Sequence, residues 1–95
     1  MSETVVSEKE MGITRRDFVR LLPRAVGHDD FELVGDTISL VDHTKKLEIT
    51  LSEESVRRIA SVALPVTVVR FAFTGYHDAA AEMAHIDFHF QRGGG

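Results

Sequence analysis

The chain has 95 residues, of which none is cysteine or tryptophan and only two are proline. The absence of cysteine excludes disulfides, thiolate metal ligands and cysteine nucleophiles, and it gives no argument for an oxidising compartment. No stretch is long and apolar enough to span a membrane, and residues 1–10 lack the basic and apolar regions of a secretion signal. We therefore expect a cytoplasmic protein without a membrane partner.

Positive charge is not in excess either. The formal net charge is −4, and half of it comes from residues 1–10, where Glu3, Glu8 and Glu10 outnumber Lys9. The rest of the chain is nearly neutral, so the charge balance does not indicate a broadly basic surface for nucleic acid.

The composition is that of one small globular domain, with 43% hydrophobic and 27% charged residues. A chain of this length supports a single core. We expect residues 1–10 to form a mobile N-terminal tail, residues 11–92 a single globular domain, and residues 93–95 a flexible glycine tail.

Apolar spacing predicts a helix near each end of the domain. Thr14 can cap the first, Gly27 can end it, and Pro23 predicts a kink or break near Leu22. The second begins near Tyr76 or His77. The positions expected to face the core are Phe18, Leu21, Leu22 and Ala25 in the first helix, and Ala79, Met83, Ile86 and Phe90 in the second.

Alternating apolar residues predict strands with one buried face. Gly35-Asp36 predicts a tight hairpin between the first two strands. The alternating runs are Phe31 and Leu33, then Ile38 and Leu40, then Leu47, Ile49 and Leu51, and finally Thr67, Val69, Phe71 and Phe73.

Residues 52–63 allow two interpretations. Ser52 can cap a helix, with Glu53 and Glu54 placed favourably at its N-terminus. Residues 58–64 could instead be extended, because apolar residues also alternate there and Pro65 disfavours a helix just before it.

With the helical interpretation, the order is α-β-β-β-α-β-α. This order predicts the α+β class, as a two-layer sandwich whose helices pack on one face of a mostly antiparallel sheet. The opposite face of the sheet is mixed, and it is either solvated or covered by a partner. Its residues would be Glu32, Val34, Thr37, Ser39, Val41, Lys46, Glu48, Thr50, Val68 and Arg70.

The last helix carries a polar stripe beside its apolar one. Asp78, Glu82, His85 and His89 follow one another at intervals of about one helical turn. Histidines four residues apart can chelate one ion, and a carboxylate one turn away can add a ligand, so the stripe predicts a metal site with zinc as the natural ion. A solvated helix face would show the same spacing.

Two further surfaces are candidates for binding a partner. Phe88 lies on a third arc of the last helix with the small residues Ala81 and Ala84, which would let another protein approach closely. The polar side of the first helix carries three arginines that could grip an acidic partner or phosphates. They are Arg16, Arg20 and Arg24.

The chain ends in Arg92-Gly93-Gly94-Gly95. This ending resembles that of ubiquitin-like modifiers and sulfur carriers, which end in a free diglycine that is activated as an acyl adenylate. The resemblance covers only the last few residues, and it implies a carrier whose flexible tail enters a partner enzyme. In those families the tail leaves a strand, whereas here it follows a predicted helix and has one extra glycine.

No catalytic arrangement is evident. Histidine stands beside aspartate in residues 28–30, 42–43 and 77–78, but neighbours in sequence do not supply a nucleophile, a base and an orienting group. We therefore expect a small cytosolic protein–protein interaction or accessory domain, homodimeric or part of a larger complex. Metal binding or delivery is the first alternative, followed by nucleic-acid binding and the carrier role.

Overall fold

The computed structural model describes residues 4–27 and 30–93, with side chains as far as Phe90. Within these ranges it has six strands and two helices, which confirms the α+β class and the mostly antiparallel sheet. In chain order the elements are β1 (Thr4–Met11), α1 (Arg15–Val26), β2 (Leu33–Val34), β3 (Thr37–Asp42), β4 (Lys45–Leu51), β5 (Ser55–Ile59), β6 (Val62–Thr74) and α2 (Ala79–Gly93). The predicted order α-β-β-β-α-β-α is therefore wrong at β1 and at β5.

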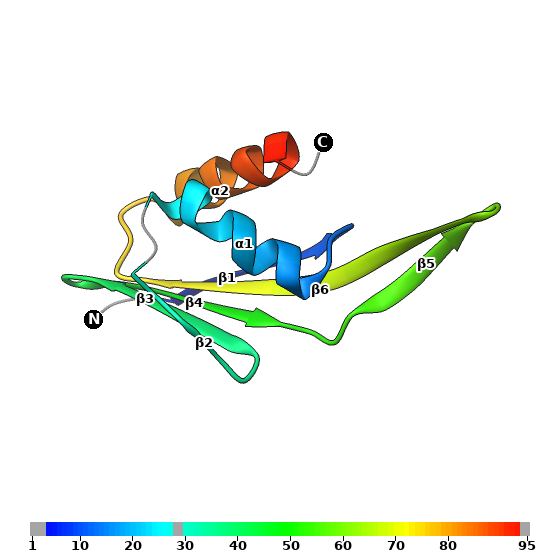
Figure 1. The fold of residues 1–95 in the computed structure, drawn as a ribbon. Helices are drawn as coiled ribbons and strands as arrows, with labels where there is room; N and C mark the ends of the chain where they lie inside the picture. The colour runs from blue at the N-terminus through cyan, green and yellow to red at the C-terminus, as the bar shows by residue number, and fades with distance from the viewer. Residues whose placement is uncertain (1–3, 28–29, 94–95) are drawn as a thin grey trace.

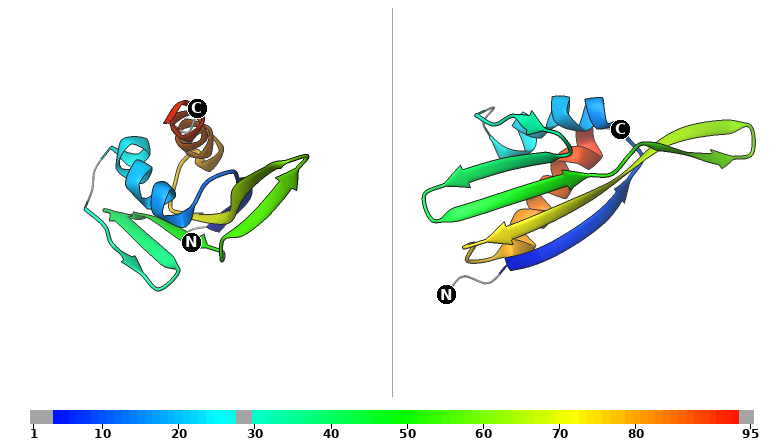
Figure 2. Two further views of the ribbon diagram at one scale, coloured as in Figure 1. Left: turned by 45° about the vertical axis from the view of Figure 1, so that its right-hand side comes forward. Right: turned by 90° about the horizontal axis from the view of Figure 1, so that it is seen from below.

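All strand pairings are antiparallel, and across the sheet the strands run β1-β6-β4-β3-β2. Residues 62–66 of β6 extend past β1 and β4 and pair with β5 instead. Figure 1 shows both helices on one side of the sheet and the β5–β6 hairpin projecting beyond it. Figure 2 shows the other side, which neither α1 nor α2 covers. We call residues 55–66 the arm, and the uncovered side of the sheet the helix-free face.

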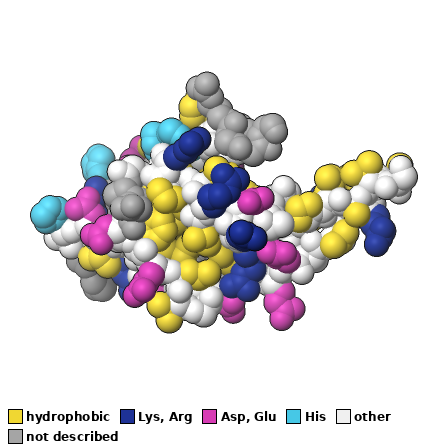
Figure 3. Space-filling view, viewed as in Figure 1, with side chains coloured by type: hydrophobic (Ala, Val, Ile, Leu, Met, Phe, Trp, Pro, Cys, Tyr) yellow, Lys and Arg dark blue, Asp and Glu magenta, His cyan; other side chains and the backbone are white. Residues whose placement is uncertain are grey.

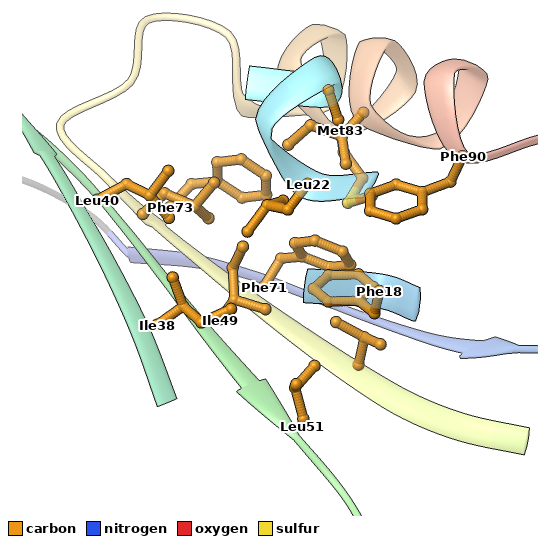
Figure 4. Close-up of a cluster of buried hydrophobic side chains, with 14 of the residues drawn as sticks. Phe18, Leu22, Ile38, Leu40, Ile49, Leu51, Phe71, Phe73, Met83 and Phe90 are labelled. Carbon is orange, nitrogen blue, oxygen red and sulfur yellow. The ribbon is translucent and has the colours of Figure 1, made fainter. Parts of the chain in front are cut away.

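The core lies between the helices and the sheet, and its centre is an aromatic contact. Phe18 of α1 stacks on Phe90 of α2 with ring centroids 4.7 Å apart, and its centroid is 6.3 Å from that of Phe71 in β6. Figure 4 shows these rings among the other buried side chains. Such aromatic pairs contribute roughly 0.5–1.5 kcal/mol each beyond the burial of their surface. One ring, that of Phe18, therefore links both helices to the sheet.

The ends of α1 follow from its sequence. The side chain of Thr14 accepts a hydrogen bond from the backbone N–H of Asp17 at 3.1 Å, and Gly27 ends the helix with a left-handed φ of 83°. The predicted break near Leu22 is wrong, because the helix continues through Pro23 to Val26. Burial of the apolar face on both sides of the proline offsets the backbone hydrogen bond that proline cannot donate. Neither described helix is long and apolar enough to cross a membrane.

The expectation of a mobile tail over residues 1–10 is wrong for its described part. Residues 4–11 form β1, which pairs with β6 along its whole length, from Thr4 opposite Thr74 to Met11 opposite Thr67. β1 is an edge strand, and Val5 and Val6 remain about half exposed. Its order comes from backbone pairing with β6, which leaves no hydrophobic pattern in the sequence.

The helical interpretation of residues 52–63 is also wrong. These residues enter β5, turn at Ala60 and Ser61, and begin β6. Ala60 takes a left-handed φ of 54°, as a two-residue hairpin turn requires. The residues that would form the buried face of such a helix are exposed, so no tertiary contact stabilises a helix there. Continued backbone pairing with β6 favours the extended form.

A close backbone contact holds the β6–α2 loop against the β3–β4 turn. Gly75 has a φ of 78°, and a Cβ added to it would lie 2.3 Å from the carbonyl oxygen of Thr44. Only glycine allows both this conformation and this approach. The contact places Tyr76, the next residue, beside Lys45.

We expect Gly75→Ala to lower the free energy of unfolding by about 1–3 kcal/mol, because it adds both a clash and an unfavourable φ. Urea denaturation of the purified protein measures the change. Gly35→Ala is the matched control, since Gly35 also has a positive φ of 63° but no atom within 4 Å of the added Cβ. Equal losses in the two variants would show that the contact with Thr44 contributes nothing.

Candidate functional site

The predicted metal stripe does not come together as a ligand set. Asp78 accepts a hydrogen bond from the backbone N–H of Ala81 at 3.0 Å, so its carboxylate caps α2. His85 and His89 are adjacent, with ring centroids 4.6 Å apart. In the described part of the chain, no group of three or more histidine, aspartate or glutamate side chains is placed to hold a metal ion. The reason is distance, because eleven residues of helix span about 16 Å.

Part of the stripe instead lines a pocket of about 400 Å³ between the end of α1, the β3–β4 hairpin and the first half of α2. Apolar and polar side chains both line the pocket. The apolar lining residues are Ala25, Val26, Leu40, Val41, Leu47, Ala81 and Ile86, and the polar or aromatic ones are Asp42, Lys45, Tyr76, Glu82 and His85.

Tyr76 brings an aromatic ring and a hydroxyl group to this pocket. Its ring meets the ring of Phe73 edge to face at 5.3 Å, and the Lys45 ammonium lies 5.4 Å from its centroid. Burial raises the pKa of the Tyr76 hydroxyl above its ordinary value, and the negative charges of Glu82 and Asp42 raise it further. The hydroxyl therefore stays protonated at neutral pH and is suited to donating a hydrogen bond.

The histidine–aspartate neighbours do not form a catalytic pair in the described residues. His43 Nε2 lies 3.7 Å from Asp42 Oδ1, but both side chains are largely exposed in the β3–β4 turn. His77 and Asp78 are exposed before α2, where Asp78 acts as a helix cap. His28 and Asp29 lie outside the described residues.

The predicted partner-binding residues lie on two different helices. On α2, Phe88 is 53% exposed, and Ala81 and Ala84 are exposed as well. On α1, Arg20 Nε lies 3.5 Å from Asp17 Oδ1, in an exposed pair that contributes little to stability. Arg16 and Arg24 are also exposed. These surfaces remain predictions. Of the terminal glycines, Gly93 ends α2, and Gly94 and Gly95 lie outside the described residues.

The arm is the most exposed part of the described chain, and the sequence patterns did not single it out. Every residue from Glu53 to Leu64 is exposed. The large apolar side chains among them are Val56, Ile59, Val62 and Leu64. Figure 3 shows hydrophobic side chains gathered on this projection. The alternation of apolar residues before Pro65 was the available signal, but the turn lacks the glycine that usually marks a hairpin.

Strand register assigns the arm side chains to two faces, because residues directly opposite each other share a face. Ile59 lies opposite Val62, and Arg57 opposite Leu64, with one position between the two pairs. These four residues therefore form one face. Val56, opposite Pro65, and Arg58, opposite Ala63, form the other.

We expect any zinc response of the protein to be confined to His85 and His89, which are the two potential ligands in contact. The response should weaken as the solution is made more acidic, because a protonated imidazole cannot bind a metal. NMR of the histidine side chains during a zinc titration measures it. His85→Ala with His89→Ala should abolish the response, and Asp78→Ala should leave it unchanged. A response that survives the double replacement would exclude α2 as the site.

Tyr76 is the only tyrosine and there is no tryptophan, so phenolate absorbance reports this residue alone. We expect the pH midpoint of the Tyr76 titration to be higher in the folded protein than in the protein unfolded in urea. Glu82→Gln should lower the midpoint without restoring the unfolded value, because burial is the larger cause. Glu48→Gln, on the other side of the sheet, is the control.

The raised pKa of Tyr76 also makes stability depend on pH. Since the unfolded chain releases the Tyr76 hydroxyl proton at a lower pH than the folded chain, the free energy of unfolding should fall as pH rises past about 10.

Comparisons with protein-family models, with curated proteins and with solved structures gave no match.

Proposed function

We propose that this protein is a protein–protein interaction module and that the arm is its contact element. The observation that carries the proposal is the run of exposed residues from Glu53 to Leu64, with four large apolar side chains on a hairpin that projects from the domain. An isolated two-stranded hairpin is at best marginally stable in water. Contact with another protein would bury its apolar side chains and stabilise it.

The exposed apolar side chains of the arm support this role. Val56, Ile59, Val62 and Leu64 are between 42% and 62% exposed, although each has a large hydrophobic side chain. Burying such side chains against another protein removes apolar surface from water and favours association.

The shape of the molecule agrees with this role. The radius of gyration is 13.7 Å, compared with about 12.4 Å for a compact domain of this length. The principal extents are 49 × 24 × 21 Å, and the arm projects along the long direction, as Figure 1 shows. A projecting element of this kind can reach the surface of another protein while the core remains unchanged.

Two contacts connect the arm to the sheet. Arg57 forms an exposed ion pair with Glu10 of β1, and such a pair contributes little to stability. Ser52 receives a hydrogen bond from the backbone N–H of Val68 at 2.9 Å, just before the arm begins. The rest of the arm is accessible to a partner.

The test is the size of the native assembly in a gentle extract of cells that express the tagged chain. We expect the wild-type chain to elute well above the 10.6 kDa of a monomer. The double variant Val56→Asp and Ile59→Asp, which places a charge on each face of the arm, should elute as a monomer. Circular dichroism of the purified variant checks that it is folded. If both chains elute as monomers, or both remain in the assembly, the arm is not the contact element.

A further inference from the structure

We propose that the pocket beside Tyr76 binds a small organic amine, with a positively charged amino group on an aliphatic body. The pocket lies at the end of the molecule opposite the arm. Figure 1 shows the end of α1, the β3–β4 turn and the start of α2 coming together there. The inference goes beyond the interaction role of the arm and does not depend on it.

The pocket has the size of a small-molecule site. Its volume of about 400 Å³ lies within the range of about 300–1,000 Å³ that is usual for ligand pockets. Its lining residues come from α1, β3, β4, the β6–α2 loop and α2. A ligand would therefore contact several elements that the core already holds in place.

The least exposed side chains of the lining are all apolar. Ala25, Leu40, Leu47 and Ile86 are each at most 5% exposed, and they come from α1, β3, β4 and α2. A polar group placed against them would lose hydrogen bonds to water without gaining others. The part of a ligand that reaches these residues should therefore be aliphatic.

The ionisable side chains of the lining lie nearer to solvent and carry a net negative charge. Asp42, Glu82 and His85 are exposed, whereas Lys45 and Tyr76 are partly buried. With histidine and tyrosine neutral, two carboxylates and one ammonium leave a net charge of −1. Charge complementarity therefore favours a cation over an anion.

Asp42 and Lys45 already balance each other's charge. Lys45 Nζ lies 3.8 Å from Asp42 Oδ2, and it also lies over the ring of Tyr76. On its other side, Asp42 Oδ1 is 3.7 Å from His43 Nε2. Neither Asp42 nor Lys45 therefore needs a ligand to compensate its charge.

Glu82 is the lining carboxylate whose charge is not compensated. Within the described ranges of the chain, its side chain forms no ion pair and no hydrogen bond. Asp78, one helical turn earlier, adds further negative charge while it caps α2. The exposed Arg24 of α1 does not line the pocket. A bound ammonium group would therefore supply the positive charge that Glu82 lacks.

Tyr76 offers the same ligand two further contacts. Its hydroxyl oxygen can accept a hydrogen bond from an ammonium group. Its ring already has one ammonium group at 5.4 Å, that of Lys45, so a cation is accommodated beside it. The Glu82 carboxylate and the Tyr76 hydroxyl then share the amino group of the ligand, and the aliphatic body extends towards Leu40, Leu47 and Ile86.

NMR of the backbone amides during titration with hexylamine at neutral pH tests the site. Hexan-1-ol and hexanoate carry the same aliphatic chain with a neutral or a negative end group. We expect hexylamine to shift the signals of the lining residues and to bind more tightly than the other two probes. No shift with any probe would remove the site. Tighter binding of hexanoate, or equal binding of hexan-1-ol, would overturn the choice of a cation.

Glu82→Gln tests the carboxylate. We expect hexylamine to bind roughly threefold more weakly, as for the loss of one exposed ion pair, and hexan-1-ol to bind as before. Glu48→Gln, on the helix-free face, makes the same change of charge away from the pocket and should leave both affinities unchanged. Equal weakening by the two variants would show that overall charge, and not this site, attracts the amine.

Ala81→Leu tests the pocket itself. Ala81 is exposed on α2 and lines the pocket, so a leucine there should fill part of the space without disturbing the core. We expect hexylamine binding to fall on the order of tenfold or more. Ala80→Leu is the matched control, since Ala80 is exposed on the same helix but does not line the pocket. Thermal unfolding checks that both variants are folded. Unchanged binding in Ala81→Leu would overturn the proposal.

The pocket and the arm can be tested separately. The arm variant with Val56→Asp and Ile59→Asp should bind hexylamine as the wild-type chain does, because neither residue lines the pocket. Loss of amine binding in this variant, once it is shown to be folded, would overturn the assignment of the amine to the pocket.

Discussion

The rest of the structure depends on the pairing of β6, which supplies a register to three other strands. β1 and β4 pair with its second half on opposite edges, and β5 pairs with its first half. One side of this 13-residue strand carries the centre of the core, including Phe71 and Phe73. Alternation along the strand puts Val68, Arg70, Ala72 and Thr74 on the other side, which neither helix covers.

The sequence predicted those elements whose side chains are buried at a regular period. Phe18 and Leu22 indicate α1, and Ile49 and Phe71 indicate the central strands, because each of these side chains is buried in the core. β1 left no such pattern, since an edge strand is ordered by its backbone and its side chains remain partly exposed. Residues 52–63 fitted two periods, and the choice between them depended on pairing with a strand that comes later in the chain. Local patterns do not contain that information.

For the candidate sites too, the sequence predicted what local spacing determines and missed what depends on residues far apart in the chain. The sequence identified the exposed arc of Phe88 and the types of side chain along α2, but spacing on a helix defines a face and not a common ligand position. Asp78 is used to cap the helix, whereas Glu82 joins a pocket with Tyr76. That pocket depends on the approach of Gly75 to Thr44, two residues about thirty positions apart in the chain. No spacing rule connects them, so the pocket could be found only from the fold.

The pairing of β1 with β6 also has a consequence for synthesis on the ribosome. Thr4 and Thr74 are partners 70 positions apart, so β1 has no native neighbour until most of the chain has been made. Contacts of such long range slow folding, because the intervening loop must close before they form. During elongation the nascent chain holds β1 unpaired, and the β5–β6 hairpin, whose strands are neighbours in sequence, can form before the sheet that supports it. The pairing of β1 therefore waits until β6 has been made.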